Sequence, residues 1–260
     1  MPIRDDESIE IPSGSKAQAL AQLQPLLGRL ETDAAHYAAE LPESTGELAA
    51  GAIDVWDDGD GEVNFVQALV LERLLAGRLE RVDVDADIEV DQAESAQVII
   101  RHGSLRVSGN LFLHAPLMVL GDLEVGGRVA DLVKASRLVV AGNLSCKTMR
   151  IGSPVWVGGD VDCIAVCFDP GGKLWVGGEL RAKVVVGSVQ SGGVTAGKLN
   201  ARFHSPPSDW ERPGPGALYA LERVLVPEAF RRADRERGYF QPDDLLQLIE
   251  VGRPFLRETR

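Results

Sequence analysis

A nine-residue pattern of apolar and polar positions recurs along the middle of the chain. Apolar residues alternate with other residues up to a glycine, and a second alternating run follows one polar residue later. The five copies are LRVSGNLFL (105–113), LMVLGDLEV (117–125), LVVAGNLSC (138–146), VWVGGDVDC (155–163) and LWVGGELRA (174–182). Alternation with period two is typical of β-strands, and a glycine between two such runs marks a bend. Each copy therefore predicts a strand, a corner and a second strand.

The spacing of the corner glycines predicts how these strands assemble. Successive glycines from Gly109 to Gly178 are 12, 21, 17 and 19 residues apart. A degenerate copy at residues 82–90 and a weak copy around Gly197 extend the series. Repeats of this length are too short to contain a helix, and they match one coil of a parallel β-solenoid. We assign the short step after Gly109 to an irregular coil.

Alternation also predicts which side chains point inward. Coils of a solenoid stack about 4.8 Å apart, so equivalent inward residues form continuous apolar ladders. One ladder is expected to contain Val107, Val119, Val140, Val157 and Val176, and the next Leu111, Leu123, Leu144, Val161 and Leu180.

Helical patterns flank the repeats on both sides. Residues 15–30, 32–41 and 64–76 have apolar residues at helical spacing, with Ser15 and Asn64 as N-caps. After a turn-rich stretch at 204–217, prolines open two further helices at 227–238 and 242–252. A solenoid exposes unpaired strand edges at both ends, and terminal helices are candidates to cover them.

The predicted fold is mainly β with flanking helices. We expect a parallel β-solenoid (β-helix) of about six to seven coils, capped by an N-terminal helical unit and by C-terminal helices. The expected divisions are an acidic helical unit at 1–78, the solenoid at 79–203, and a linker with a helical cap at 204–260.

Charge is distributed unevenly along the chain. Residues 1–104 contain 22 acidic and 7 basic residues, a net charge of −15, whereas residues 105–260 contain 17 and 20, a net charge of +3. Such a negative field repels nucleic acid and anionic membranes and favours solubility or a basic protein partner. No apolar run is long enough for a membrane span, and the first residues lack the features of a signal peptide. With only three cysteines, the chain is expected to be cytoplasmic.

Candidate chemical sites have simpler structural explanations. The acidic stretch DVWDDGDGE (54–62) does not fit a calcium loop in either glycine frame. With Gly61 as the sixth residue, Trp56 falls at position one and Gln67 at position twelve. With Gly59 as the sixth residue, Trp56 falls at position three and Phe65 at position twelve. Cys146 and Cys163 occupy equivalent positions in adjacent repeats, with Cys167 nearby, and core packing is favoured over a metal site. Signatures of nucleotide binding and of activated nucleophiles are absent from the sequence. We expect no catalytic residue, no cofactor and no metal.

A polar residue follows each corner glycine. A turn ladder is favoured over a cation site or an acid–base site, because Asn and Asp suit such turns. The series is Asn110, Asp122, Asn143, Asp160 and Glu179.

A second series of outward positions is mostly large and apolar. It comprises Arg106, Met118, Val139, Trp156 and Trp175. An exposed apolar stripe of this size needs burial, either beneath a terminal helix or against a partner. We favour a terminal helix, for which Leu245, Leu246 and Ile249 mark a candidate.

The phrases GDLEV, AGNL and WVGGDV in stacked register resemble the bactofilin-like, polymer-forming β-solenoids over residues 82–201. The resemblance implies a bacterial, cytoplasmic, nucleotide-independent scaffold that polymerises through its coil edges. Unlike members of that family, this chain has long helical flanks, so we expect a monomer or small oligomer and not a filament. The chain is also similar to polymer-forming solenoid proteins that accompany bacterial toxin systems. Its charge balance is similar to that of acidic immunity proteins that plug basic toxins.

The sequence therefore favours a non-enzymatic protein-binding module. Its sharpest form is an immunity-type protein that neutralises a cognate bacterial toxin, and the alternative is a self-assembling scaffold. An enzyme acting from a groove between solenoid and helices ranks third. Electrostatic steering is assigned to acidic residues, and two tryptophans are assigned as anchors if they are uncovered. The expected contacts are Asp54, Asp57, Asp58, Asp60, Glu62, Asp83, Asp85, Asp87, Trp156 and Trp175.

Overall fold

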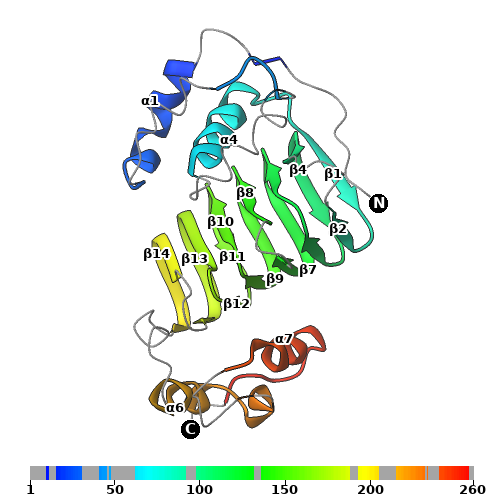
Figure 1. Cartoon of the computed structure of the whole chain (residues 1–260), viewed down its shortest axis with the longest axis vertical. Helices are drawn as coiled ribbons and strands as arrows, with labels where there is room; N and C mark the ends of the chain where they lie inside the picture. Colours follow the sequence, from blue (N-terminus) through cyan, green and yellow to red (C-terminus); the bar gives the residue numbers. More distant parts are fainter. Residues whose placement is uncertain are drawn as a thin grey trace.

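Parallel strands stack into a β-solenoid with helices along its length (Figure 1). The structure, a computed structural model, describes residues 10–11, 16–30, 41–45, 47, 62–91, 98–131, 136–187, 193–204, 215–231, 233 and 240–257. The solenoid has about 6 turns, and helices from both ends of the chain accompany it. The predicted fold class is confirmed.

Each coil crosses three faces of the solenoid, which we call A, B and C. Face A contains β1 (Glu80–Val84), β4 (Gly103–Val107) and β11 (Val161–Asp162), and face B contains β2 (Ile88–Val90), β5 (Leu111–Leu113) and β12 (Ala165–Phe168). Face C contains β3 (Ile99–Arg101), β6 (Leu117–Val119), β8 (Leu138–Val140) and β10 (Pro154–Val157).

Four long strands bend around corners and contribute to more than one face. Their bounds are β7 (Leu123–Asp131), β9 (Leu144–Ile151), β13 (Lys173–Gly187) and β14 (Gly193–His204). The first two run from face A to face B, whereas β13 and β14 run from face C across face A to face B. The coils are thereby joined into one continuous parallel sheet.

The strand register explains the short step in the glycine series. Gly109 lies at the corner between faces A and B, and its amide donates to the carbonyl of Ala86 at 3.3 Å. The other corner glycines lie between faces C and A, where Gly121 stacks on Gly103. The series at that corner is Gly103, Gly121, Gly142, Gly159, Gly178 and Gly197, with steps of 18, 21, 17, 19 and 19 residues. The assignment of an irregular coil at Gly109 was therefore wrong.

The same correction changes the membership of the inward ladders. Val107 stacks on Val125 and not on Val119, and Leu111 stacks on Val129 and not on Leu123. All ten predicted residues are nevertheless inward and belong to the core. The face C ladder contains Val119, Val140, Val157, Val176 and Ala196, and the face A ladder contains Val82, Leu105, Leu123, Leu144, Val161, Leu180 and Leu199.

The N-terminal helices cover face C. The helix α4 (Glu62–Leu74) lies against the sheet, and α1 (Lys16–Leu27) lies against α4 (Figure 1). The helix α4 begins before Asn64, so the predicted N-cap is wrong: Asn64 lies within the helix and is fully buried. Pro25 lies within the last turn of α1.

The outward apolar stripe is buried beneath these N-terminal helices. It runs along face C as Ile100, Met118, Val139, Trp156 and Trp175. Cover by a terminal helix is therefore confirmed, but the choice of helix was wrong. Arg106, which the sequence placed in the stripe, lies on face A, where it forms an ion pair with Glu124 at 3.3 Å.

The C-terminal helices cover face B. They are α6 (Pro215–Val224), the short helix η1 (Pro227–Phe230) and α7 (Pro242–Glu250). The residues Leu245, Leu246 and Ile249 of α7 form a core with outward residues of face B. Arg150 adds a polar anchor, because its guanidinium reaches Asp169 at 2.6 Å and Asp243 of α7 at 2.5 Å.

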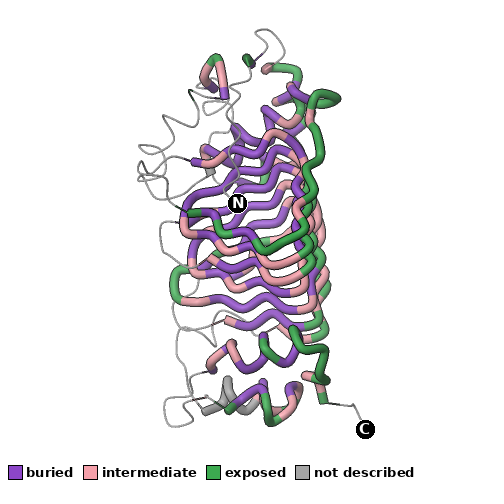
Figure 2. Tube along the Cα trace, turned by 90° about the vertical axis from the view of Figure 1, so that its right-hand side faces the viewer, coloured by how far each residue is buried: buried purple, intermediate pink, exposed green. Residues whose placement is uncertain are grey.

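Unlike faces B and C, face A and the two ends of the stack are not covered by the described helices. The described helices line faces B and C instead of capping the ends, and face A carries most of the exposed residues of the coils (Figure 2). Within the described residues, β1 pairs only with β4, and β14 pairs only with β13. The first and last coils therefore present strand edges without a partner strand in that part of the chain.

Candidate interaction surface

The two tryptophans expected as anchors are packed inside the molecule. Trp156 is 5% exposed and Trp175 is 8% exposed. The ring of Phe65, from α4, meets Trp175 edge to face at 4.9 Å. The guanidinium of Arg29 lies 5.0 Å from the same indole ring and also donates to the carbonyl of Val176 at 2.9 Å. The two tryptophans were expected to anchor a partner only if they were uncovered, and they are covered. Both residues instead pack against the N-terminal helices.

Half of the predicted acidic set lies outside the described residues. These residues are Asp54, Asp57, Asp58 and Asp60. Glu62 is the first residue of α4.

The remaining acidic residues come together on the first coil, where all three are exposed. Asp83 forms an ion pair with Arg81 at 2.9 Å. Asp85 accepts a hydrogen bond from the Ser108 hydroxyl at 2.7 Å. Asp87 accepts one from the Asn110 amide at 2.7 Å. These carboxylates therefore order the corner between the first two coils, and their exposure leaves them available to a partner.

Three further acidic residues complete an acidic end of the solenoid. Glu80, Glu89 and Asp91 are exposed on the same coil. Sequence reasoning missed them, although the alternation in VDVDADIEVD (82–91) indicates that Glu89 and Asp91 point outward. We call the six carboxylates of this coil the acidic end: Glu80, Asp83, Asp85, Asp87, Glu89 and Asp91.

The apolar ladder of face A is left open at both ends of the stack. Its first residue, Val82, is 37% exposed, and its last, Leu199, is 38% exposed. Such side chains would be covered by another coil in the middle of a solenoid. The last coil differs in charge from the first, because β14 contains Lys198 and Arg202 and no acidic residue.

The outward charges of face A neutralise one another in two networks. In the first, Arg81 reaches Asp83 at 2.9 Å and Glu124 at 3.0 Å. In the second, Arg181 reaches Asp160, Asp162 and Glu179, each at 3.1 Å. The hydrogen bonds that Arg181 donates to the carboxylates of Asp162, Asp160 and Glu179 raise the pKa of Arg181. Asp83 belongs both to the first network and to the acidic end. Charges paired in this way attract a charged partner less than the other carboxylates of the acidic end, which form no ion pair within the described residues.

The polar series after the corner glycines forms a ladder of side-chain to backbone hydrogen bonds. The Asp122 carboxylate accepts from the Asn143 amide at 2.7 Å, and Asn143 accepts from Asp160 at 2.8 Å. Asp160 continues the ladder by accepting from Glu179 at 2.8 Å. Asn110 belongs to a separate ladder at the other corner, where it accepts from Arg128. The predicted turn ladder is confirmed, in two parts.

The cysteines belong to the packed interior. Cys146 and Cys163 are neighbours in adjacent coils and contribute to the inner core, whereas Cys167 packs beneath the C-terminal helices. Burial raises the pKa of the Cys146 thiol and that of the Cys167 thiol. A protonated thiol is a poor nucleophile and a poor metal ligand, so the geometry favours packing.

Comparison with known proteins adds no relative: no family model, curated protein or solved structure matches the chain. Within the described residues, the helices are too short or too polar to cross a membrane.

Proposed function

We propose that this protein is a non-enzymatic protein-binding module that binds a basic partner at the acidic end of its solenoid. The observation that carries the proposal is the concentration of six exposed carboxylates against one exposed arginine, Arg81, on the described part of the first coil, beside a strand edge that has no partner strand there. Charge of one sign steers an oppositely charged partner. The exposed Val82 and the edge of β1, which has no second partner strand among the described residues, offer short-range contacts.

The sharpest form of this proposal is an immunity-type protein of the bacterial cytoplasm that neutralises a cognate toxin by direct binding. Support comes from the resemblance to solenoid proteins that accompany toxin systems and from the acidic end, which suits a basic toxin domain. Binding alone neutralises a toxin if the complex covers the toxin's own active surface, so the proposal requires no catalytic residue in this chain.

A charge-matched pair of variants tests the proposal. The variant Asp83→Asn with Asp85→Asn removes two carboxylates from the acidic end. The control Asp162→Asn with Glu228→Gln removes two exposed carboxylates from β11 and η1. Each protein is immobilised and exposed to a lysate of the source organism, and retained proteins are identified at low and high salt.

The proposal predicts a basic protein that the wild type and the control retain and that the Asp83/Asp85 variant releases at lower salt. Equal retention by all three proteins, or retention that does not depend on salt, would remove the acidic end from binding. A captured toxin whose activity falls on addition of the purified protein would establish the sharper form.

A self-assembling scaffold is the second candidate, and a specific observation favours it. The acidic first coil and the basic last coil are complementary in charge, and each exposes one end of the face A ladder. A second copy could therefore stack head to tail. The net charge of −12 on every copy opposes long assemblies, because repulsion accumulates with each added molecule. For this reason we rank a basic partner above a second copy.

A further inference from the structure

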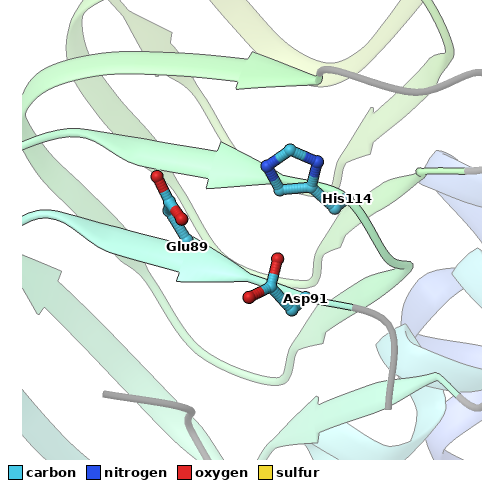
Figure 3. Close-up of side chains that lie close together, drawn as sticks. All are labelled: Glu89, Asp91 and His114. Carbon is cyan, nitrogen blue, oxygen red and sulfur yellow. The ribbon is translucent and has the colours of Figure 1, made fainter. Parts of the chain in front are cut away.

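Three potential metal ligands meet at the surface where the first two coils pair. Glu89 and Asp91 project from β2 and from the residue that follows it, and His114 directly follows β5 (Figure 3). The ligand atoms of the three side chains all lie within 4.8 Å of one another. Sequence reasoning missed this group because the acidic residues and the histidine are more than 20 residues apart along the chain.

The strand register fixes the positions of the three residues. Glu89 pairs with Phe112, Val90 with Leu113, and Asp91 therefore lies opposite His114. The backbone amide of His114 donates to the carbonyl of Val90 at 2.8 Å, which extends the pairing to the histidine. Glu89 and Asp91 are two residues apart on a strand, so alternation directs both side chains outward on the same side.

The three side chains have no competing partners in the part of the chain that the structure describes. Neither carboxylate forms a hydrogen bond or an ion pair there, and the imidazole of His114 has none either. The other carboxylates of the first coil differ, because Asp83, Asp85 and Asp87 each have a partner. Close packing of two carboxylates without a cation is unfavourable, and a bound cation would relieve that repulsion.

We propose that Glu89, Asp91 and His114 bind one divalent transition-metal cation of the Zn²⁺ class, which bridges the first and second coils. Zinc binds histidine nitrogen and carboxylate oxygen at about 2.0 to 2.2 Å, so two ligands of one ion lie no more than about 4 Å apart. Small side-chain rotations therefore bring atoms within 4.8 Å into one coordination sphere. The imidazole selects against Mg²⁺ and Ca²⁺, which prefer oxygen ligands only.

The bridge has a structural consequence for the end of the solenoid. Glu89 and Asp91 belong to the first coil and His114 to the second, so the cation ties the outermost strand of face B to its only neighbour in the described residues. The proposal does not depend on a protein partner, and its test uses the purified chain alone.

Isothermal titration of the full chain with ZnCl₂, and separately with MgCl₂, tests the site. The variants are His114→Ala and Glu89→Gln, and the control is His204→Ala, which removes a histidine from β14 at the other end of the stack. We expect one Zn²⁺ per chain, at least about tenfold weaker binding in both site variants, and unchanged binding in the control. Magnesium is expected to bind at least about tenfold more weakly than zinc.

Thermal unfolding provides a second readout that does not depend on stoichiometry. Zinc should raise the midpoint of the wild type and of the His204→Ala control in a concentration-dependent and chelator-reversible manner, because it binds the folded chain. It should raise the midpoint of the His114→Ala variant less. Absence of zinc binding by the wild type, or equal binding by wild type and His114→Ala, would overturn the proposal.

Discussion

Single residues at the coil corners determine how closely the coils stack. A Cβ atom added at Gly177 would lie 2.0 Å from the carbonyl oxygen of Gly158 and 2.6 Å from a methyl group of Leu26 in α1. The first contact is with the backbone of the neighbouring coil, which cannot rotate away. Glycine at this corner therefore permits both the coil spacing and the approach of the N-terminal helix.

The Gly177→Ala substitution should lower the free energy of unfolding by about 1 to 3 kcal/mol, because the coils must move apart locally. Urea denaturation measures this loss. Gly28→Ala is a suitable control, since the nearest contact of its added Cβ, the carbonyl oxygen of Gln24, lies at 3.3 Å. Equal losses in the two variants would mean that coil spacing is not the cause.

Asp131 gives the fold a dependence on pH at the corner between faces B and C. Its carboxyl accepts hydrogen bonds from the amides of Gly152 at 2.6 Å and Ser153 at 2.5 Å. Burial, with a smaller contribution from Asp169, raises the pKa of Asp131 to about 6 despite these bonds. A folded-state pKa above the unfolded value of about 3.9 means that this group stabilises the fold most below pH 4.

That stabilisation should be lost as the pH rises from about 4 through 6, by up to about 2 kcal/mol. The Asp131→Asn variant cannot ionise at this position. Its free energy of unfolding should therefore rise relative to that of the wild type as the pH increases over the same interval. Urea denaturation of both proteins between pH 4.5 and 7.5 measures the difference. A difference that stays constant with pH would contradict this role for Asp131.

At the scale of elements, the helices attach to the solenoid through outward side chains of its strands. On face C, Trp175 meets Phe65 of α4 and Arg29, which follows α1 by two residues. Removing the indole would leave a cavity that neither helix can fill alone.

The Trp175→Ala substitution should therefore lower the free energy of unfolding by about 3 to 5 kcal/mol. Trp175→Phe keeps an aromatic ring against Phe65 and should cost clearly less. Chemical denaturation monitored by circular dichroism compares the two variants. A near-neutral Trp175→Ala variant would show that the N-terminal helices do not depend on this contact.

Alternation and glycine spacing were sufficient to predict the solenoid, because each coil repeats the same local physics. They did not distinguish the corner at Gly109 from the corner at Gly121, since both corners have the same alternating sequence on either side. Which helix covers which face could not be predicted either. The apolar residues of α4 and α7 suit any apolar surface, and only the tertiary arrangement assigns α4 to face C and α7 to face B.

Local alternation predicted part of the acidic end, but it could not predict contacts that depend on the register between coils. The carboxylates of Asp83, Asp85 and Asp87 follow from local alternation, whereas the approach of His114 to Asp91 depends on the register between coils. The pattern of the sequence could not predict the burial of Trp156 and Trp175, because it depends on residues of α4 that lie more than 80 positions earlier in the chain.

The whole molecule combines a strongly negative net charge with two ends of unlike character. The first coil is acidic, the last is basic, and each end exposes part of the apolar ladder of face A. A basic partner relieves the net charge of −12, whereas a second copy of the chain doubles it. This difference separates a module that binds another protein from a scaffold that polymerises.

Size-exclusion chromatography with light scattering, over a wide range of protein concentrations and at low and moderate salt, tests that distinction most directly. Our account predicts a monomer or small oligomer whose mass does not change with concentration, because charge repulsion opposes stacking of the ends. Growth into long assemblies as the concentration rises would contradict it, and the self-assembling scaffold would then replace the protein-binding module.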